Sequence, residues 1–159
     1  MNASSNLEAT IKRSHKMLVI FDLDGTLSLT GHRDHFLNRP AGDKDWRAFY
    51  AACDKDWPCV PIVRTAQTLA ATGSDVRIWT GRSDEVADKT TAWLAANGLG
   101  DIPIKMRRAG DFTPDTKLKE DWLQELSRKP DLVFEDRARV VEMWRSHGIR
   151  VCQVAEGGF

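Results

Sequence analysis

The chain has 159 residues, and its 23 Lys and Arg side chains balance 23 Asp and Glu, so its formal net charge is zero. This length suits one domain, and 42% apolar residues are too many for an intrinsically disordered chain. The balanced charge argues against a protein that coats nucleic acid or binds membranes through a polybasic surface.

Cysteines and targeting signals exclude further classes. Cys53, Cys59 and Cys152 show no CxxC spacing, which indicates neither a disulfide framework nor a zinc cluster. The apolar run 17–21 is far too short to cross a membrane and has no signal-peptide cleavage site after it. We therefore expect a cytoplasmic protein that does not contact membranes.

The predicted elements alternate along the chain. Residues 1–15 are polar without a clear period, and we predict a flexible leader followed by one domain over 16–159. The apolar run 16–21 predicts a buried strand. Further strands are predicted at 76–80, 102–106, 131–134 and 149–154, with helices that begin near 61, 83, 115 and 137. This order predicts an α/β fold, a doubly wound parallel sheet in three layers.

Residues 28–58 interrupt the alternation. The segment predicts a small insertion after the first strand, with a short aromatic helix within 43–54. It is too short for a large cap, so we expect an active site open enough to admit a chain end. Trp46 and Trp57 of this insertion are the tryptophans to consider near a substrate, although packing is favoured for both. Trp79, Trp93, Trp122 and Trp144 are assigned to the core.

Chemistry-bearing residues follow three predicted strands. In such folds sites lie beyond the carboxyl ends of the strands. The residues found there are Asp22-Leu23-Asp24-Gly25-Thr26, Thr80-Gly81-Arg82 and Glu135-Asp136-Arg137. Acids, a hydroxyl and arginines are therefore expected at one edge of the sheet.

Asp22 and Asp24 are the first pair of acids. Carboxylates at i and i+2 share a direction if strand geometry persists, so one could attack phosphorus while the other transfers a proton. The alternative is a turn with a capping Asp and a left-handed Gly25. The position directly after a buried strand favours the catalytic interpretation.

The remaining blocks offer phosphate and metal ligands. Thr80 and Arg82 can hold phosphoryl oxygens, and either Lys117 or Lys119 can supply a fixed cation while the other is solvated. Glu135 and Asp136 suit Mg²⁺, although Asp136 could instead cap the next helix. Arg107 and Arg108 extend the basic rim or are simply solvated.

Together these blocks resemble the haloacid dehalogenase (HAD) superfamily of phosphohydrolases. The matching pieces are Phe21-Asp22-Leu23-Asp24-Gly25-Thr26-Leu27, Ile78-Trp79-Thr80-Gly81-Arg82, a lysine of the third block and Phe134-Glu135-Asp136-Arg137. A closer resemblance is to the 3′-phosphatase domain of bacteriophage-type polynucleotide kinase/phosphatases. It rests on Gly31-His32-Arg33, Asp45-Trp46-Arg47-Ala48-Phe49-Tyr50, the block from Glu135 to Arg145, Gln153-Val154-Ala155 and Gly158-Phe159.

The resemblance implies roles for individual residues. Asp22 would be the nucleophile that forms an aspartyl-phosphate, and Asp24 the general acid and then base. Thr80 would bind the phosphoryl group, and Lys119 would be the motif lysine, with Lys117 as alternate. The implied substrate-binding residues are His32, Arg33, Gly81, Arg82 and Arg137. The implied Mg²⁺ ligands are Asp22, the Asp24 carbonyl and Asp136, with Glu135 behind them or acting through water, where the family often has a second aspartate.

The implied function is Mg²⁺-dependent removal of a terminal 3′-phosphate from DNA or RNA. One alternative is the same chemistry on free nucleotides or other small phosphomonoesters. Another is a non-catalytic phospho-accepting or binding module, against which the second acid, Asp24, argues. The chain contains no GxxxxGK[ST] motif, so we expect no kinase activity, and a separate kinase or ligase would act as partner.

Overall fold

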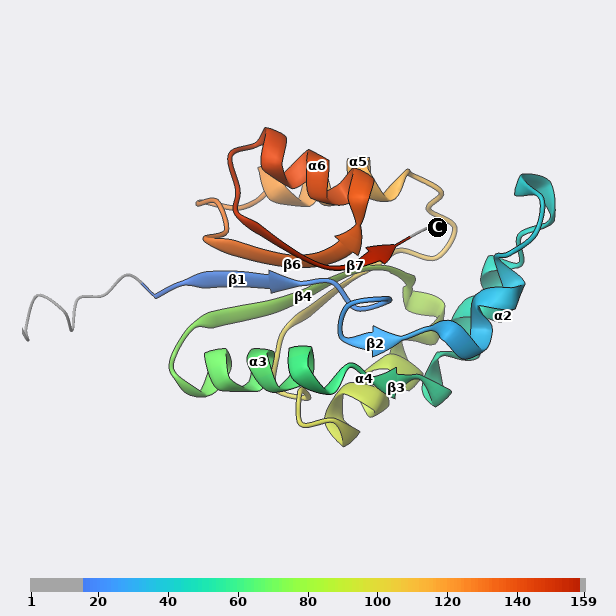
Figure 1. The fold of residues 1–159 in the computed structure, drawn as a ribbon, viewed down its shortest axis with the longest axis horizontal. Coiled ribbons are helices and arrows are strands. Elements are labelled where there is room, and N and C mark those ends of the chain that lie inside the picture. Colours follow the sequence, from blue (N-terminus) through green and yellow to red (C-terminus); the bar gives the residue numbers. More distant parts are fainter. Residues whose placement is uncertain (1–15, 158–159) are drawn as a thin grey trace, which may run out of the picture.

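The fold is built on one parallel sheet. The computed structural model describes residues 16–157, so the predicted leader 1–15 and the pair Gly158-Phe159 lie outside the described residues. The sheet has five strands in the order β5-β4-β1-β6-β7, and Figure 1 labels β1, β4, β6 and β7. Their bounds are β1 Leu18–Phe21, β4 Asp75–Ser83, β5 Ile104–Arg107, β6 Leu132–Arg137 and β7 Val151–Gly157. The first strand of the chain therefore lies at the centre of the sheet.

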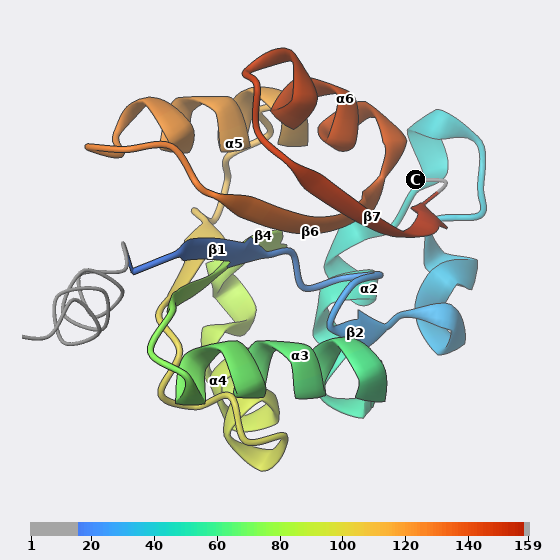
Figure 2. The ribbon, with the colours of Figure 1, turned by 60° about the vertical axis from the view of Figure 1, so that its left-hand side comes forward.

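Helices cover both faces of this sheet, as Figures 1 and 2 show. One face carries α3 (Val60–Ala71) and α4 (Ala87–Ala96), and the other carries α5 (Asp115–Gln124) and α6 (Ala138–Ser146). The predicted three-layer α/β fold is confirmed. No helix among residues 16–157 is long and apolar enough to cross a membrane.

Strand alternation divides the core into two clusters. Val19 and Phe21 pack into the cluster beneath α3 and α4, whereas Ile20 points into the cluster beneath α5 and α6. The ring of Phe21 stacks on that of Phe134 in the neighbouring strand, with 4.3 Å between centroids. The four tryptophans assigned to the core, Trp79, Trp93, Trp122 and Trp144, are buried. The centre of the sheet is therefore rigid up to the point where Asp22 begins.

The two strands that carry the second and last motifs are longer than predicted. β4 continues through Thr80 and Gly81 to Ser83, and β6 continues to Arg137. In each, the pairing shifts register at an irregularity and then resumes against the neighbouring strand. The motif residues therefore lie on bent strand ends rather than in loops beyond them.

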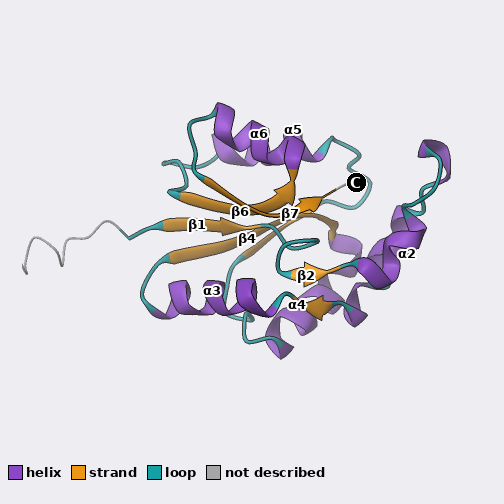
Figure 3. Ribbon diagram, viewed as in Figure 1, coloured by secondary structure: helices purple, strands orange, loops and turns teal. Residues whose placement is uncertain are grey.

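Residues 28–58 form the insertion at the carboxyl end of the sheet (Figure 3). It begins and ends on a short antiparallel pair, β2 (Ser28–Leu29) and β3 (Trp57–Pro58). Between them lie α2 (Trp46–Ala51) and three short 3-10 helices, Gly31–Phe36, Ala41–Asp43 and Cys53–Lys55. The predicted aromatic helix is thus shorter than the segment 43–54. The insertion brings its side chains against the ends of β1 and β4.

Candidate active site

A buried lysine joins two of the predicted acids. Lys119 Nζ donates to Asp22 Oδ1 at 2.6 Å and to Glu135 Oε2 at 2.7 Å. It also lies 3.5 Å from Asp115 Oδ2, one helical turn earlier on α5. Burial would lower the pKa of Lys119, but the charges of Asp115, Asp22 and Glu135 outweigh burial and raise it well above its usual value. Lys119 is therefore a fixed positive charge beside Asp22.

The alternative lysine points elsewhere. Lys117 lies on the opposite face of α5, with 52% of its side chain exposed, and it pairs with Asp121 at 2.7 Å. Of the two candidates, the structure brings Lys119 to the acids and leaves Lys117 in solvent.

Three buried carboxylates gather where a metal ligand set was expected. One oxygen each from Asp22, Glu135 and Asp136 lies within 4.8 Å of the others. Burial and the charge of Glu135 raise the pKa of Asp22 well above its usual value, and burial and the charge of Asp22 raise that of Asp136 to about 6. Lys119 supplies one positive charge against these three carboxylates, so an excess of negative charge remains. A divalent cation would neutralise this excess.

The backbone around Asp136 leaves room only for glycine. At Gly25 (φ +89) and at Gly157, a Cβ atom would run into Asp136 Oδ2. Asp136 Oδ1 accepts a hydrogen bond from the Thr26 hydroxyl at 3.2 Å. Helix α6 has Arg137 at its N-cap position and no side-chain cap, so Asp136 is not its capping residue. The all-oxygen donor set of Asp22, Glu135 and Asp136 fits a hard divalent cation such as Mg²⁺.

Asp24 is held by two arginines. Arg33 Nη2 donates to Asp24 Oδ1 at 2.5 Å, and Arg82 contacts the same carboxylate through Nη2 and, at 3.2 Å, through Nε. Burial would raise the pKa of Asp24, but the charges of Arg82 and Arg33 outweigh burial and hold it well below its usual value. Asp24 is therefore ionised in this arrangement.

A second carboxylate completes this buried network. Asp56 accepts from Arg33 Nε at 2.7 Å and Nη2 at 2.6 Å, and from Arg82 Nη2 at 3.1 Å. His32 Nε2 lies 2.9 Å from Asp56 Oδ1. Arg33, Arg82 and His32 were expected around the scissile phosphate. Both arginines pair with Asp24 and Asp56, and His32 reaches Asp56, because the insertion brings a second acid against two buried guanidinium groups. Their contact with a phosphate stays a prediction.

Thr80 is fully buried on the bent end of β4. Its hydroxyl accepts a hydrogen bond from the Arg82 N–H at 3.1 Å. This contact helps to fix the turn of backbone that carries Gly81 toward the neighbouring pocket.

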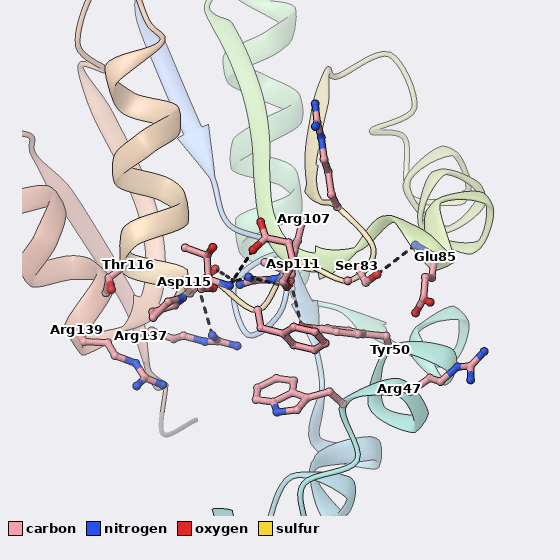
Figure 4. Close-up of a pocket in the computed structure, with 17 residues that line it drawn as sticks. Arg47, Tyr50, Ser83, Glu85, Arg107, Asp111, Asp115, Thr116, Arg137 and Arg139 are labelled. Carbon is pink, nitrogen blue, oxygen red and sulfur yellow. Dashed lines mark hydrogen bonds and ion pairs between the residues drawn. The ribbon is translucent and has the colours of Figure 1, made fainter. Parts of the chain in front are cut away.

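The structure also contains a pocket of about 560 Å³. Figure 4 draws the side chains that line it. Gly81, Asp115 and Arg137 are among its lining residues, so two of the expected substrate-binding residues line it. Arg137 Nη1 lies 3.4 Å from Asp115 Oδ2, and Asp115 in turn contacts Lys119. Asp115 therefore links the pocket to Lys119.

The wall of the pocket is tied to Gly81. Its carbonyl oxygen accepts from Arg107 Nε at 2.8 Å and from the Tyr50 hydroxyl at 3.1 Å. Burial and the charge of Asp24 raise the pKa of Tyr50 to about 12, so the phenol stays a hydrogen-bond donor at neutral pH. Arg107 is thus built into the wall rather than solvated.

Sequence reasoning missed Asp56 and Asp115, and it gave Tyr50 no role of its own. Arg107, which was expected to extend the basic rim or to be solvated, lines the pocket. Asp115 carried a usable signal, because it lies one helical turn before Lys119. Asp56 carried none, because nothing in the sequence of the insertion distinguishes it from the neighbouring Asp54.

Comparison with known proteins gives the family. Residues 16–159 match the family model described as the polynucleotide kinase PNKP phosphatase domain. A chain of the Pnkp1/Rnl/Hen1 RNA repair complex is 26% identical with a TM-score of 0.76, and the match covers 92% of this chain and 45% of that one. In a second structure of a Pnkp1/Rnl/Hen1 complex the identity is again 26%, with a TM-score of 0.75 and coverage of 92% and 48%. The chain thus spans about half the length of both.

More distant structures share the fold. The class C acid phosphatase from Bacillus anthracis, with tungstate bound, is 15% identical with a TM-score of 0.63 and coverage of 98% of this chain and 74% of that one. A dehalogenase is 12% identical, with a TM-score of 0.62 and coverage of 92% and 88%. Together with the match over nearly the whole chain, the site geometry gives one conclusion: the chain belongs to the polynucleotide kinase PNKP phosphatase domain family of the HAD superfamily and is a phosphoric monoester hydrolase.

Proposed function

We propose that the protein removes the 3′-phosphate from the ends of RNA or DNA strands in a Mg²⁺-dependent reaction. The observation that carries this proposal is the placement of Asp22 between Lys119 and two further acids. Lys119 in turn contacts Asp115, which lines an open pocket with arginines in its wall. The similarity to chains of an RNA repair complex supports a polynucleotide end as substrate. A separate ligase or kinase would then act on the healed end.

In the first half-reaction Asp22 is the nucleophile. A carboxylate oxygen of Asp22 attacks the phosphorus, the bond between phosphorus and the 3′-oxygen breaks, and an aspartyl-phosphate forms. Lys119 orients the Asp22 carboxylate and offsets negative charge that develops on the phosphoryl oxygens. Asp24 gives a proton to the leaving 3′-oxygen. Because two arginines hold Asp24 ionised, the side chain must turn away from them to carry that proton.

In the second half-reaction Asp24 is the base. It takes a proton from a water molecule, the water oxygen attacks the phosphorus, and the bond between phosphorus and the Asp22 oxygen breaks to give inorganic phosphate. The ionised state of Asp24 in the structure suits this step directly. Arg33 and Arg82 would act by holding Asp24 in place rather than by binding the phosphate.

The residues that would hold Mg²⁺ are Asp22, Asp136 and the backbone carbonyl of Asp24, with Glu135 behind them because Lys119 occupies its Oε2. When bound, the cation would neutralise the carboxylates and draw charge from the phosphoryl oxygens. Gly25 and Gly157 let the backbone pass close to the Asp136 carboxylate, which a Cβ atom at either position would displace.

The test compares matched oligonucleotides of RNA and of DNA that carry a 3′-phosphate, a 5′-phosphate or neither, together with 3′-mononucleotides. Release of inorganic phosphate is measured with Mg²⁺ or with EDTA, and Asp22→Asn is the control variant. We expect release only from 3′-phosphorylated ends with Mg²⁺. Release from mononucleotides alone would contradict the assignment to polynucleotide ends, and activity in Asp22→Asn would contradict the nucleophile.

A further inference from the structure

The two edges of the main sheet differ in how well they are protected against pairing. The strand order ends at β5 on one side and at β7 on the other. Strand β5 has four residues and carries Lys105 and Arg107, and short strands with basic side chains are typical of edges that avoid further pairing. Strand β7 has seven residues, of which Glu156 alone is charged. The edge at β7 therefore lacks the features that protect β5.

The backbone of β7 has free hydrogen-bonding groups at this edge. The Val133 N–H of β6 donates to the Arg150 carbonyl at 3.0 Å, and Val133 lies opposite Val151 in the parallel ladder. Backbone groups of successive residues alternate between the two sides of a strand, so those of Val151 and Gln153 point away from β6. Within residues 16–157 no strand lies beyond β7 in the sheet. These groups can therefore pair with a strand from outside the chain.

The side chains of β7 also leave this edge uncovered. Cys152 and Gln153 are consecutive and both exposed, and so are Ala155 and Glu156. Successive side chains of a strand point to opposite faces of the sheet. Exposure of two neighbouring residues therefore means that the sheet is open on both faces at this part of the edge, which leaves room for another strand alongside.

Opposite charges lie at the two ends of this open stretch. Arg150 lies directly before β7 and Glu156 near its end, and both side chains are exposed. Neither forms an ion pair with any residue in the part of the chain that the structure describes. Antiparallel pairing centred on Gln153 places Arg150 of one copy opposite Glu156 of a second copy, and two-fold symmetry repeats this pair. The edge is therefore complementary in charge to itself.

The other neighbours across such a pairing are uncharged. Val151 would face Ala155 of the second copy, and Cys152 would face Val154. Val151 and Val154 pack into the core clusters on opposite faces of the sheet, so the alternation of side chains is regular as far as Val154. The irregular pairing with β6 lies after Gln153. With 23 basic and 23 acidic residues, two copies also do not repel each other through net charge.

We propose that two copies of the chain associate through their β7 edges, antiparallel and centred on Gln153, to form a two-fold symmetric dimer with one continuous sheet. The occupant of the edge is a second copy rather than an unrelated strand, because Arg150 and Glu156 then pair on both sides of the symmetry axis. The dimer does not depend on the proposed function, since the catalytic steps use no residue from Arg150 to Glu156.

The first test measures the mass of the full chain by light scattering over a range of protein concentrations. We expect wild type to approach twice the 17.9 kDa of one chain. Arg150→Glu and Glu156→Arg each convert both symmetric ion pairs into like-charge pairs, so each should raise the Kd of the dimer by about 10- to 100-fold. The double variant restores opposite charges and should return to the Kd of wild type.

Arg145→Glu is the matched control, because it makes the same change of charge at an exposed position in the last turn of α6. Its Kd should match that of wild type. A mass of one chain at every concentration would overturn the dimer. Equal Kd values for wild type and both single reversals would place the contact on another surface, and a loss in Arg145→Glu as large as in Arg150→Glu would mean that net charge and not the proposed pair controls association.

A disulfide tests the register of the two strands. Val154→Cys places a second thiol opposite Cys152 of the other copy, at a position without direct hydrogen bonds, where the Cα atoms of antiparallel strands lie about 4.5 Å apart. Oxidation by glutathione disulfide should then give a covalent dimer, and removal of Cys152 from this variant by Cys152→Ser should prevent it. Melting temperatures establish that each variant is folded.

Wild type is the second control for the register, because its Cys152 would face Val154 and should form no covalent dimer. A covalent dimer of wild type at the rate of Val154→Cys would mean that Cys152 faces itself, and the pairing centred on Gln153 would be wrong. Failure of folded Val154→Cys to crosslink would overturn the register as well.

Discussion

The two lysines of α5 give a direct comparison at the scale of single residues. We predict that Lys119→Ala abolishes phosphatase activity and lowers the free energy of unfolding by about 3–5 kcal/mol, because buried acids lose their counter-charge. Lys117→Ala removes only a solvent-exposed ion pair with Asp121, so its phosphatase activity and its free energy of unfolding should match those of wild type. Phosphate release and denaturant unfolding would measure this. Equal effects of the two substitutions would show that Lys119 has no special role.

Asp56 is the residue on which the arginine network depends. Asp56→Ala leaves two buried guanidinium groups facing Asp24 alone, and we predict a loss of about 3–5 kcal/mol in the free energy of unfolding. In the more conservative Asp56→Asn the fold should survive. We expect kcat to fall with little change in KM, because the substitution displaces Asp24 and leaves the contacts with the substrate unchanged. Asp54→Asn, at an exposed position beside Lys89, is the control and should resemble wild type. A rise in KM alone in Asp56→Asn would point to a direct substrate contact instead.

Residue type and spacing could predict which groups belong to the site, but not every contact that they make. Asp22, Thr80 and Asp136 follow neighbouring strands of one sheet, so topology alone brings them to one edge. The partners of Arg33 and Arg82 could not be predicted, because they depend on how the insertion packs. A guanidinium beside a phosphatase motif looks the same in sequence whether it faces a phosphate or a buried carboxylate.

At the scale of elements, strand β7 contributes to the acidic cluster because its last residue, Gly157, has no side chain to displace the Asp136 carboxylate. A Cβ at Gly157 would meet Asp136 Oδ2 and approach the Arg137 N–H at 3.0 Å, so Gly157→Ala must displace the Asp136 carboxylate. We predict that the apparent Kd for Mg²⁺ rises by about 10- to 100-fold, measured by calorimetric titration. Gly42→Ala, with no atom near the added methyl, is the control. Unchanged Mg²⁺ affinity in Gly157→Ala would show that Asp136 is not a ligand.

The lengths of β4 and β6 show that the local apolar pattern does not predict where these strands end. The apolar periods located all five strands of the main sheet, because buried faces dictate them. The polar ends of β4 and β6 were not predicted as strand, since Gly81 to Ser83 and Glu135 to Arg137 have no apolar alternation. Their pairing with β5 and β7 resumes after an irregularity, which only the partner strands determine.

At the scale of the whole molecule, zero net charge constrains how the substrate is held. The acids gather at the catalytic centre and Arg47, Arg108 and Arg139 lie at the pocket rim, so a balanced total still leaves a local basic surface. Such a surface can contact a few phosphates near one end but cannot follow a long stretch of backbone. The salt dependence of binding therefore reports how much of the strand is gripped.

We predict a shallow salt dependence. With two or three phosphate contacts, a plot of log K against log salt for a 3′-phosphorylated single strand should have a slope of about −1.4 to −2.1, because each contact contributes about −0.7. Binding is measured by fluorescence anisotropy with Asp22→Asn, so that no turnover occurs. Arg47→Gln should make the slope shallower by about 0.7 if its side chain meets a backbone phosphate. A slope steeper than about −4 would mean that the strand runs over a much longer path than the pocket and its rim provide, and the end-binding geometry would then be wrong.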